Sequence, residues 1–245
     1  MSAATLALRQ VAWENKAFWR NPAAAFFIFA FPLMFLFIFA GVFKDNTQYF
    51  VPSIAAFSVI TACYTNIAMN VAFAREEGVL KRKRGTPLPG TAYLLGKIMH
   101  ATLIALLLVL IVSLCGRFLY DVALPGRTLA AFVVTLAVGA AAFCSLGLAI
   151  TAVIPNADAA PAIVNASILP LLFLSGVFFP TDDAPEWMTT IADVFPIKHF
   201  AEAVMSAFNP GSGSGWEASD LFVVAVWGVV GLLGAIRFFS WEPRG

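Results

Sequence analysis

Long apolar runs separated by short polar segments dominate the pattern of this sequence. A transmembrane helix needs about 20 predominantly apolar residues to cross a hydrocarbon core that is roughly 30 Å thick. Six segments meet or approach this length: 22–43, 49–74, 98–116, 128–154, 159–181 and 221–241. A lipid-exposed backbone must satisfy its own hydrogen bonds, and no alternating strand pattern is present. The pattern therefore predicts an all-α integral membrane protein, a single transmembrane domain over residues 1–245 with six helices.

The last of these segments needs a charged residue to reach full length. Its uncharged part, 221–236, has 16 residues, which rise about 24 Å as a helix. We extend it to Trp241 because Arg237 can direct its guanidinium group toward the headgroups while its stem stays in the apolar layer.

Residues 1–21 have the pattern of an amphipathic helix in the membrane interface. One face groups the cations Arg9, Lys16 and Arg20. Another face groups apolar residues: Ala4, Leu8, Val11, Ala12, Phe18 and Trp19. An ordinary cytoplasmic extension of the first span is the alternative interpretation of the same residues.

Segment 182–220 is too polar to span and too apolar for a free loop. Two stretches in it, 185–196 and 197–208, place apolar residues three and four positions apart. This spacing predicts two short helices that dip into or lie along the outer interface. A glycine- and serine-rich connection, 211–215, follows them.

Charge fixes the expected orientation. The chain is 60% hydrophobic and only 12% charged, whereas soluble domains carry about 25% charged residues. Segment 75–97 holds six of the 15 Lys and Arg residues. With six spans, this segment and both termini lie on the same side of the membrane, and eleven of the 15 Lys and Arg residues are on that side. Cationic loops are retained in the cytoplasm. We therefore expect both termini and segment 75–97 to be cytoplasmic.

No catalytic or metal-binding pattern emerges from the reactive residue types. The stretch Gly90–Lys97 approximates a phosphate-binding loop, but five residues separate its glycines and Ile98 follows the lysine; that loop requires four residues and then Ser or Thr. Cys63, Cys115 and Cys144 lie in apolar runs, where cysteine behaves as a small hydrophobe. We predict no catalytic residue, no metal and no cofactor bound by this chain. The acidic residues near 182–186 fit a solvated loop better than a cation site.

Polar residues inside the apolar runs are candidates for a solute path, because unpaired polar groups in hydrocarbon are costly and usually face a bundle interior or cavity. They occur at helical spacing in the second run and once in the fifth: Thr61, Thr65, Asn66, Asn70 and Asn165. Hydrogen bonding between helices without any role in transport explains the same spacing equally well.

Two stretches resemble the permease subunits of type-2 ATP-binding-cassette (ABC) exporters. The first is 75–78 with its continuation through 80–82 and 86–88, and the second is 174–180 with 185–187 and 195–196. Both stretches occur in the family's order among six spans. The first segment of the chain, whose last residues are Trp19, Arg20 and Asn21, is similar to the family's interface helix. The resemblance covers nearly the whole chain and is strongest to the daunorubicin-resistance-like branch of drug and lipid exporters.

The resemblance implies a coupling helix in the cytoplasmic coupling loop, 75–97, seated in a groove of a separate ATPase subunit. ATP and Mg²⁺ would then be bound by that partner, and a second permease copy, identical or closely related, would complete the transporter in a bacterial plasma membrane. The predicted coupling residues are Glu76, Glu77, Gly78, Leu80, Lys81 and Arg84. Lys81–Arg84 can also contact anionic membrane lipids; no nucleic-acid partner is expected.

The physical pattern of the loop agrees with such a helix. Residues 75–84 can continue the second span into water until Gly85 ends it, and Leu80 then lies one turn from Glu76 and one from Arg84. An apolar contact framed by both charge signs suits docking to a protein surface.

The predicted function is ATP-driven outward movement of a hydrophobic or amphiphilic solute, such as a drug or a lipid-like molecule. Export of a lipid-linked glycan is an alternative substrate class. An ATPase-independent channel or ion-driven carrier is the alternative mechanism, but ion coupling normally needs a buried acidic residue in a span, and none of the six segments contains one.

Overall fold

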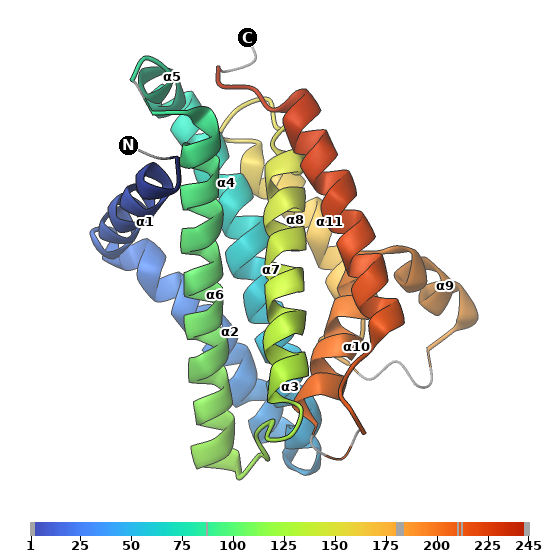
Figure 1. Ribbon diagram of the computed structural model, residues 1–245. Coiled ribbons are helices and arrows are strands. Elements are labelled where there is room, and N and C mark those ends of the chain that lie inside the picture. The colour runs from blue at the N-terminus through green and yellow to red at the C-terminus, as the bar shows by residue number, and fades with distance from the viewer. Residues whose placement is uncertain (1–2, 87, 180–183, 210, 212, 243–245) are drawn as a thin grey trace.

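The computed structural model describes residues 3–86, 88–179, 184–209, 211 and 213–242 of the chain. The regular elements in these ranges are all helices, which confirms the predicted fold class (Figure 1). In chain order they are α1 (Ala3–Trp19), α2 (Pro22–Val42), the 3₁₀ turn η1 (Lys44–Asn46), α3 (Thr47–Ile60), the π-helical turn η2 (Thr61–Thr65), α4 (Asn66–Glu76), α5 (Val79–Arg84), α6 (Gly90–Tyr120), α7 (Leu129–Ile150), α8 (Ala160–Leu174), α9 (Glu186–Val194), α10 (Pro196–Phe208) and α11 (Ala218–Phe238).

Five helices among the described residues are long and apolar enough to cross a membrane. They are Ala25–Val42 within α2, the continuous stretch Lys44–Glu76 from η1 to α4, and all of α6, α7 and α11. These helices coincide with five of the six predicted spans. The molecule is therefore a multi-pass integral membrane protein.

The predicted span 159–181 forms only the shorter helix α8. Its 15 residues rise about 22 Å, less than the hydrocarbon core. However, Arg75 binds the Ile154 carbonyl just before α8, and the Tyr49 hydroxyl binds the Gly176 carbonyl just after it. Tyr49 and Arg75 are about 39 Å apart along the helix that contains them. The segment thus runs along most of α3–α4, and the sixth crossing stays a prediction.

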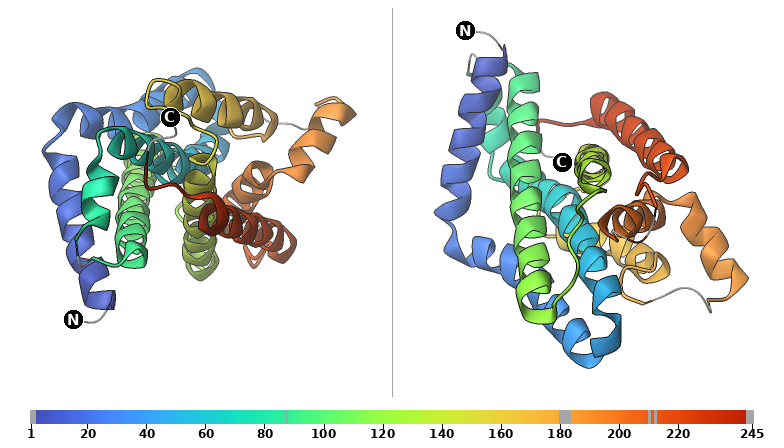
Figure 2. Two further views of the ribbon diagram at one scale, coloured as in Figure 1. Left: turned by 90° about the horizontal axis from the view of Figure 1, so that it is seen from above. Right: turned by 60° about the horizontal axis from the view of Figure 1, so that its bottom comes forward.

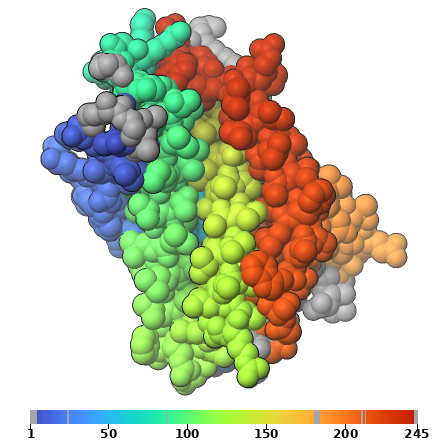
Figure 3. All heavy atoms as spheres, viewed as in Figure 1, coloured from blue at the N-terminus to red at the C-terminus, as the bar shows by residue number. Residues whose placement is uncertain are grey.

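The helix α3–η2–α4 forms the centre of the bundle. Every residue from Phe50 to Ile60 is buried, and α2, α6, α7 and α10 pack around this helix. On the face shown in Figure 3, α6, α7 and α11 lie side by side, and α7 packs along α11. Large apolar residues are exposed on the outer helices, for example Phe222 and Ile236 of α11, as expected for a membrane protein.

The bundle has two distinct ends. The α5 end holds α5, the start of α6, the end of α7 and the end of α11, with α1 packed along the flank of α6 (Figures 1 and 2). The opposite end holds the turn between α2 and α3. Both described ends of the chain, in α1 and after α11, therefore lie at the α5 end.

Both short helices predicted in segment 182–220 are present as α9 and α10. Their surroundings differ: α9 buries only Ala192, whereas α10 inserts between α3, α7 and α11 and buries Phe200, Val204 and Phe208. The apolar stripe of α10 thus belongs to the core of the bundle. The predicted solvated acidic loop falls partly on Asp182 and Asp183, which lie outside the described residues, as do Pro87 and Pro180 of the stretches noted above.

Candidate functional site

The charged loop at the α5 end is broken by a glycine. α4 ends at Glu76, and Gly78 adopts φ +68°, a left-handed conformation that favours glycine. The chain then starts the short helix α5 in a new direction, and Gly85 caps its end. The predicted continuous helix over 75–84 is therefore wrong at Gly78, whereas its predicted end at Gly85 is confirmed.

This break changes which side chains face outward. Glu76, Glu77, Lys81 and Arg84 are exposed. Leu80 is completely buried, so the predicted surface contact at Leu80, framed by Glu76 and Arg84, is wrong. Leu80 instead packs α5 onto the core cluster of the bundle. The exposed surface offered by the loop is charged, with carboxylates before the glycine and cations after it.

Arg75 ties this loop to a second turn of the molecule. Its side chain is 1% exposed. Nη1 donates to the Thr151 carbonyl at 3.0 Å, and Nη2 donates to the Ile154 carbonyl. The last carbonyls of a helix lack partners within the helix, so Arg75 supplies donors where α7 ends. The sequence places Arg75 in the stretch 75–78 that resembles the family, but no spacing predicts that its side chain is buried while the neighbouring basic residues are exposed.

Glu14 of α1 joins the loop from the other side. Its carboxylate accepts from Lys97 Nζ at 3.1 Å and from Gln10 Nε2 at 2.6 Å, and Lys83 Nζ lies 3.9 Å away. Lys83 also lies over the Tyr93 ring, 4.3 Å from its centroid. Glu14 thus links α1, α5 and α6, although the sequence pattern of α1 indicated only its cations and its apolar residues.

Burial and the charges of this cluster shift two pKa values outside the spans. Burial alone would raise the pKa of Glu14, but the charge and hydrogen bond of Lys97 and the charge of Lys83 lower it below its ordinary value. Burial lowers the pKa of Lys83, which Glu14 only partly offsets. The carboxylate of Glu14 is therefore held ionised between two cations.

Close approach of α1 and α6 explains the glycine in the apparent phosphate-loop stretch. A Cβ atom at Gly96 would lie 2.5 Å from Gln10 Cγ and 3.2 Å from the Ala7 carbonyl oxygen. Gly96 gives α1 room, and Lys97 pairs with Glu14. The stretch Gly90–Lys97 thus serves helix packing.

Replacing Gly96 with alanine should lower the melting temperature, although helix propensity alone favours alanine by about 1 kcal/mol. The clash with Gln10 should cost about 1–3 kcal/mol. Gly41→Ala is the matched control, because a Cβ at Gly41 in α2 meets nothing within 4 Å. Thermal unfolding in detergent measures both variants, and equal melting temperatures would contradict the packing role of Gly96.

The structure shows which side of α1 faces the protein, a point that the sequence pattern left open. Leu8 and Trp19, assigned to one apolar face, are 59% and 53% exposed. The side turned to the protein instead carries Ala7, Gln10 and Glu14. Arg9, Lys16 and Arg20 are also exposed. In a membrane interface, exposed Leu8 and Trp19 would face lipid, whereas Gln10 and Glu14 face the protein.

A cavity of about 460 Å³ opens between α2, the central helix and α8. Four of the five predicted path residues line it: Thr61, Thr65, Asn66 and Asn165. Aromatic and aliphatic side chains complete its wall: Phe27, Ile28, Phe31, Pro32, Phe57, Met69, Ile168, Leu169 and Leu172. The cavity is therefore mainly apolar with a few polar groups.

Asn70 lies in a smaller neighbouring cavity of about 140 Å³, which also contains Asn66. This second cavity reaches Glu14, Lys97 and His100. Asn66 and Ile28 line both cavities. Together they form one lining that extends from the charged cluster of α1 toward the middle of the bundle.

The hydrogen bonds found for the path residues stay within their own helix. Thr61 Oγ1 donates to the Phe57 carbonyl at 2.9 Å, and Asn70 Nδ2 donates to the Asn66 carbonyl at 2.8 Å. In the same region, a hydrogen bond between two helices joins the Tyr64 and Ser167 hydroxyls at 2.7 Å. Thr61 and Thr65 bound the π-helical turn η2, and such turns often occur at functional sites. The contacts thus favour a cavity lining over a helix–helix bond for these residues.

The family is decided by a sequence profile described as ABC-2 type transporter, which matches residues 8–209. The chain belongs to the ABC-2 type transporter family. It is a permease subunit, and the membrane domain of this family has no nucleotide-binding site of its own. The family resemblance found in the stretches 75–88 and 174–196 is thereby confirmed.

Individual relatives are distant. The chain is 27% identical to the probable multidrug ABC transporter permease YbhR of Escherichia coli (strain K12) over 158 residues, which is 64% of this chain and 43% of that protein. It is 26% identical over 203 residues to the daunorubicin resistance ABC transporter permease protein DrrB1 of Streptomyces coeruleorubidus, covering 80% and 70% of the two chains. The putative transport permease YvfS of Bacillus subtilis (strain 168) is 24% identical over 206 residues, covering 81% and 84%. The chain thus spans less than half the length of YbhR.

Proposed function

We propose that this permease moves a hydrophobic or amphiphilic solute out of the cell, driven by a separate ATPase subunit that docks on the exposed residues of the charged loop. The observation that carries the proposal is the double attachment of this loop. Arg75 fixes its start to the end of α7, and Lys83 fixes α5 to Glu14 of α1. A displacement of α5 would therefore be passed to the end of α7 and to α1, whose Glu14 lines the smaller cavity.

The orientation proposed is cytoplasmic for the α5 end. Both described chain ends lie there, and most Lys and Arg residues of the chain belong to the same side under six crossings. The sixth crossing is supplied by α8 and the residues after it, on the support of the bonds from Arg75 and Tyr49. The proposed membrane is the bacterial plasma membrane.

The solute path is proposed to run along the cavity lined by Thr61, Thr65, Asn66 and Asn165. Cavity-lining residues of α2 and α8 are exposed, among them Phe27, Phe31 and Leu169, so a second permease copy facing them would enclose a path between two subunits. Its mainly apolar wall suits a drug-like or lipid-like molecule better than the sugars of a lipid-linked glycan. The names of DrrB1 and YbhR, which refer to daunorubicin and multidrug transport, agree with this class.

The docking proposal predicts a strong effect of reversing the carboxylates. Glu76→Lys with Glu77→Lys should abolish copurification of the ATPase from native membranes and reduce ATP-driven export by about tenfold or more, since like charges at an interface cost several kcal/mol. Both side chains are exposed, so the melting temperature should hold. Mass spectrometry of proteins bound to the tagged chain identifies the ATPase.

A control with the same charge change belongs away from the charged loop. Asp45→Lys with Glu186→Lys alters two exposed acidic residues far from the loop and should leave copurification intact. Docking at Glu76 and Glu77 is wrong if their reversal leaves ATPase binding at the wild-type level. Loss of ATPase in both double variants would also count against a specific surface at the loop.

A further inference from the structure

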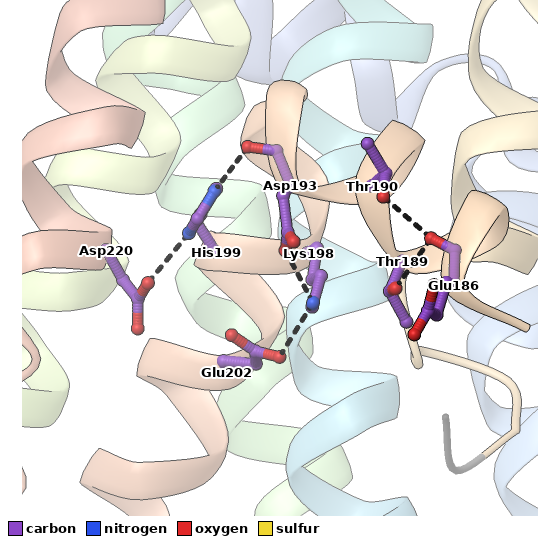
Figure 4. Close-up of polar contacts among 8 residues, drawn as sticks. All are labelled: Glu186, Thr189, Thr190, Asp193, Lys198, His199, Glu202 and Asp220. Carbon is purple, nitrogen blue, oxygen red and sulfur yellow. Dashed lines mark hydrogen bonds and ion pairs between the residues drawn. The ribbon is translucent and has the colours of Figure 1, made fainter. Parts of the chain in front are cut away.

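A histidine connects three helices of the molecule: α9, α10 and α11. His199 of α10 lies between the end of α9 and the start of α11 (Figure 4). Its Nδ1 is 2.7 Å from Asp220 Oδ1, and its Nε2 is 2.9 Å from the Asp193 carbonyl oxygen. Both ring nitrogens therefore face an oxygen at hydrogen-bond distance.

Two oxygen acceptors require two N–H donors. A neutral imidazole carries one N–H, so one of the two contacts would place a nitrogen lone pair against an oxygen lone pair. A carbonyl oxygen and an ionised carboxylate only accept. The imidazolium form donates both bonds and also carries the charge that complements Asp220. The geometry thus favours the protonated ring over either neutral tautomer.

The charges around His199 also favour the proton. Lys198 pairs with Asp193 at 2.5 Å and with Glu202 at 3.8 Å, which leaves an excess of carboxylates around one lysine. Burial alone would lower the pKa of His199, but the bonds to Asp193 and Asp220 and the charges of Asp220 and Glu202 raise it above its ordinary value. Burial has the opposite effect on the carboxyl group of Glu202 and raises its pKa.

The remaining helices packed on α10 add no charged group to this balance. α8 contains no titratable side chain, α7 contributes only the buried Cys144, and α3 contributes Tyr49, whose hydroxyl binds the Gly176 carbonyl. Glu217, just before α11, accepts a bond from Ser206 of α10 at 2.7 Å. The proton on His199 is therefore controlled by the acidic residues of α9, α10 and α11.

A metal ion suits the cluster less well than a proton. His199, Glu202 and Asp220 place ligand atoms within 4.8 Å of one another. However, two ligands at about 2.0–2.1 Å from a tetrahedral zinc ion lie about 3.3 Å apart. The 2.7 Å separation of Nδ1 and Oδ1 is instead the length of a charge-assisted hydrogen bond.

We propose that protonated His199 is a pH-sensitive latch that holds α9 and α10 against the last transmembrane helix, α11, and that loses its hold when the ring is deprotonated. α10 is buried between α3, α7 and α11, so the latch bears on the packing of the bundle and not only on a surface loop. Under the orientation in the proposed function, on which this regulatory reading rests, the latch responds to the pH outside the cell.

The direction of the effect follows from linkage. A raised pKa in the folded protein means that folding favours the protonated ring. The stabilising contribution is complete below the unfolded pKa of about 6.5, and it is lost as the pH rises through the raised pKa of the folded state. Alkaline conditions therefore release α9 and α10 from α11.

NMR titration of ¹³C-labelled histidine tests the latch directly, because the chain has two histidines and the spectrum of His199→Gln assigns the other. We expect the wild-type His199 resonance to titrate above pH 6.5, and in Asp220→Asn to titrate closer to 6.5. A His199 resonance that titrates at or below 6.5 in the wild-type protein overturns the proposal without reference to any variant.

Melting temperatures between pH 6 and 9 provide the second measurement. The wild-type value should fall with rising pH relative to His199→Gln, in which this position no longer titrates. Glu217→Gln, which alters a neighbouring contact to Ser206, should retain the wild-type pH dependence. Equal pH dependence in wild type and His199→Gln contradicts the latch, as does its abolition by a chelator, which would assign the cluster to a metal.

Regulation is tested separately in proteoliposomes that contain the complete transporter. Export should change with pH on the α9 side in wild type and become independent of it in His199→Gln. If the NMR and melting results hold but the wild-type complex exports no apolar dye at any pH, the proposed function fails and the latch stands. If export occurs but has the same pH dependence in both proteins, the regulatory role is wrong.

Discussion

Replacing Arg75 with alanine is expected to destabilise the protein by about 2–4 kcal/mol, since the Thr151 and Ile154 carbonyls lose buried donors. The same change should uncouple the proposed transporter, because the attachment between α4 and the end of α7 is lost. Thermal or denaturant unfolding in detergent measures stability. The ratio of solute exported to ATP hydrolysed measures coupling.

Two further variants separate this attachment from the loss of a charge. Arg117→Ala removes an exposed arginine at the opposite end of α6 and should change stability by less than about 0.5 kcal/mol. Arg75→Lys keeps the charge but cannot reproduce a fork of donors to two carbonyls, so it should fall between wild type and alanine. If Arg75→Ala behaves like Arg117→Ala, the attachment contributes neither stability nor coupling.

The long helices could be predicted because membrane thickness translates directly into apolar length. The charged loop could not be predicted to the same level, since its shape depends on one backbone angle. Both Gly78 and Gly85 can end a helix, and the pattern assigned the break to Gly85 alone. The left-handed Gly78 turns the chain early, which buries Leu80 and leaves the charged residues of α5 outside.

The role of α1 was predicted in part, for a reason that is specific to membranes. In a soluble protein the apolar face of a helix points to the core, and the polar face points to water. Here lipid can cover Leu8 and Trp19, so the protein-facing side is free to carry Gln10 and Glu14. Sequence periodicity reports an amphipathic helix, but it does not report which face the protein occupies.

The candidate path shows what spacing can and cannot supply. Thr61, Thr65 and Asn66 belong to one continuous helix, so the sequence predicted that they lie close together. Asn165 lies on a different helix, and only the packing of α8 against the central helix brings it to the same cavity. The contacts of Arg75 could not be predicted for a related reason. Its acceptors are backbone carbonyls, and every residue type has one.

Replacing Asn165 with tryptophan is expected to reduce export by about tenfold or more, because the indole would project into the cavity that Asn165 lines. Asn165 is exposed on α8, so the larger side chain displaces no packed core residue. Melting temperature and ATPase copurification should stay at wild-type levels. Export is measured with an apolar fluorescent dye in proteoliposomes that contain the ATPase.

Ala166→Trp is the matched control, because Ala166 is the next residue of α8, is also exposed, and does not line the cavity. The two variants add an indole one position apart, about 100° around the helix. Loss of export in both would point to a general disturbance of α8. Retention of export in Asn165→Trp would place the solute path elsewhere, whereas loss in Asn165→Trp alone assigns it to the face of α8 that meets Thr61 and Asn66.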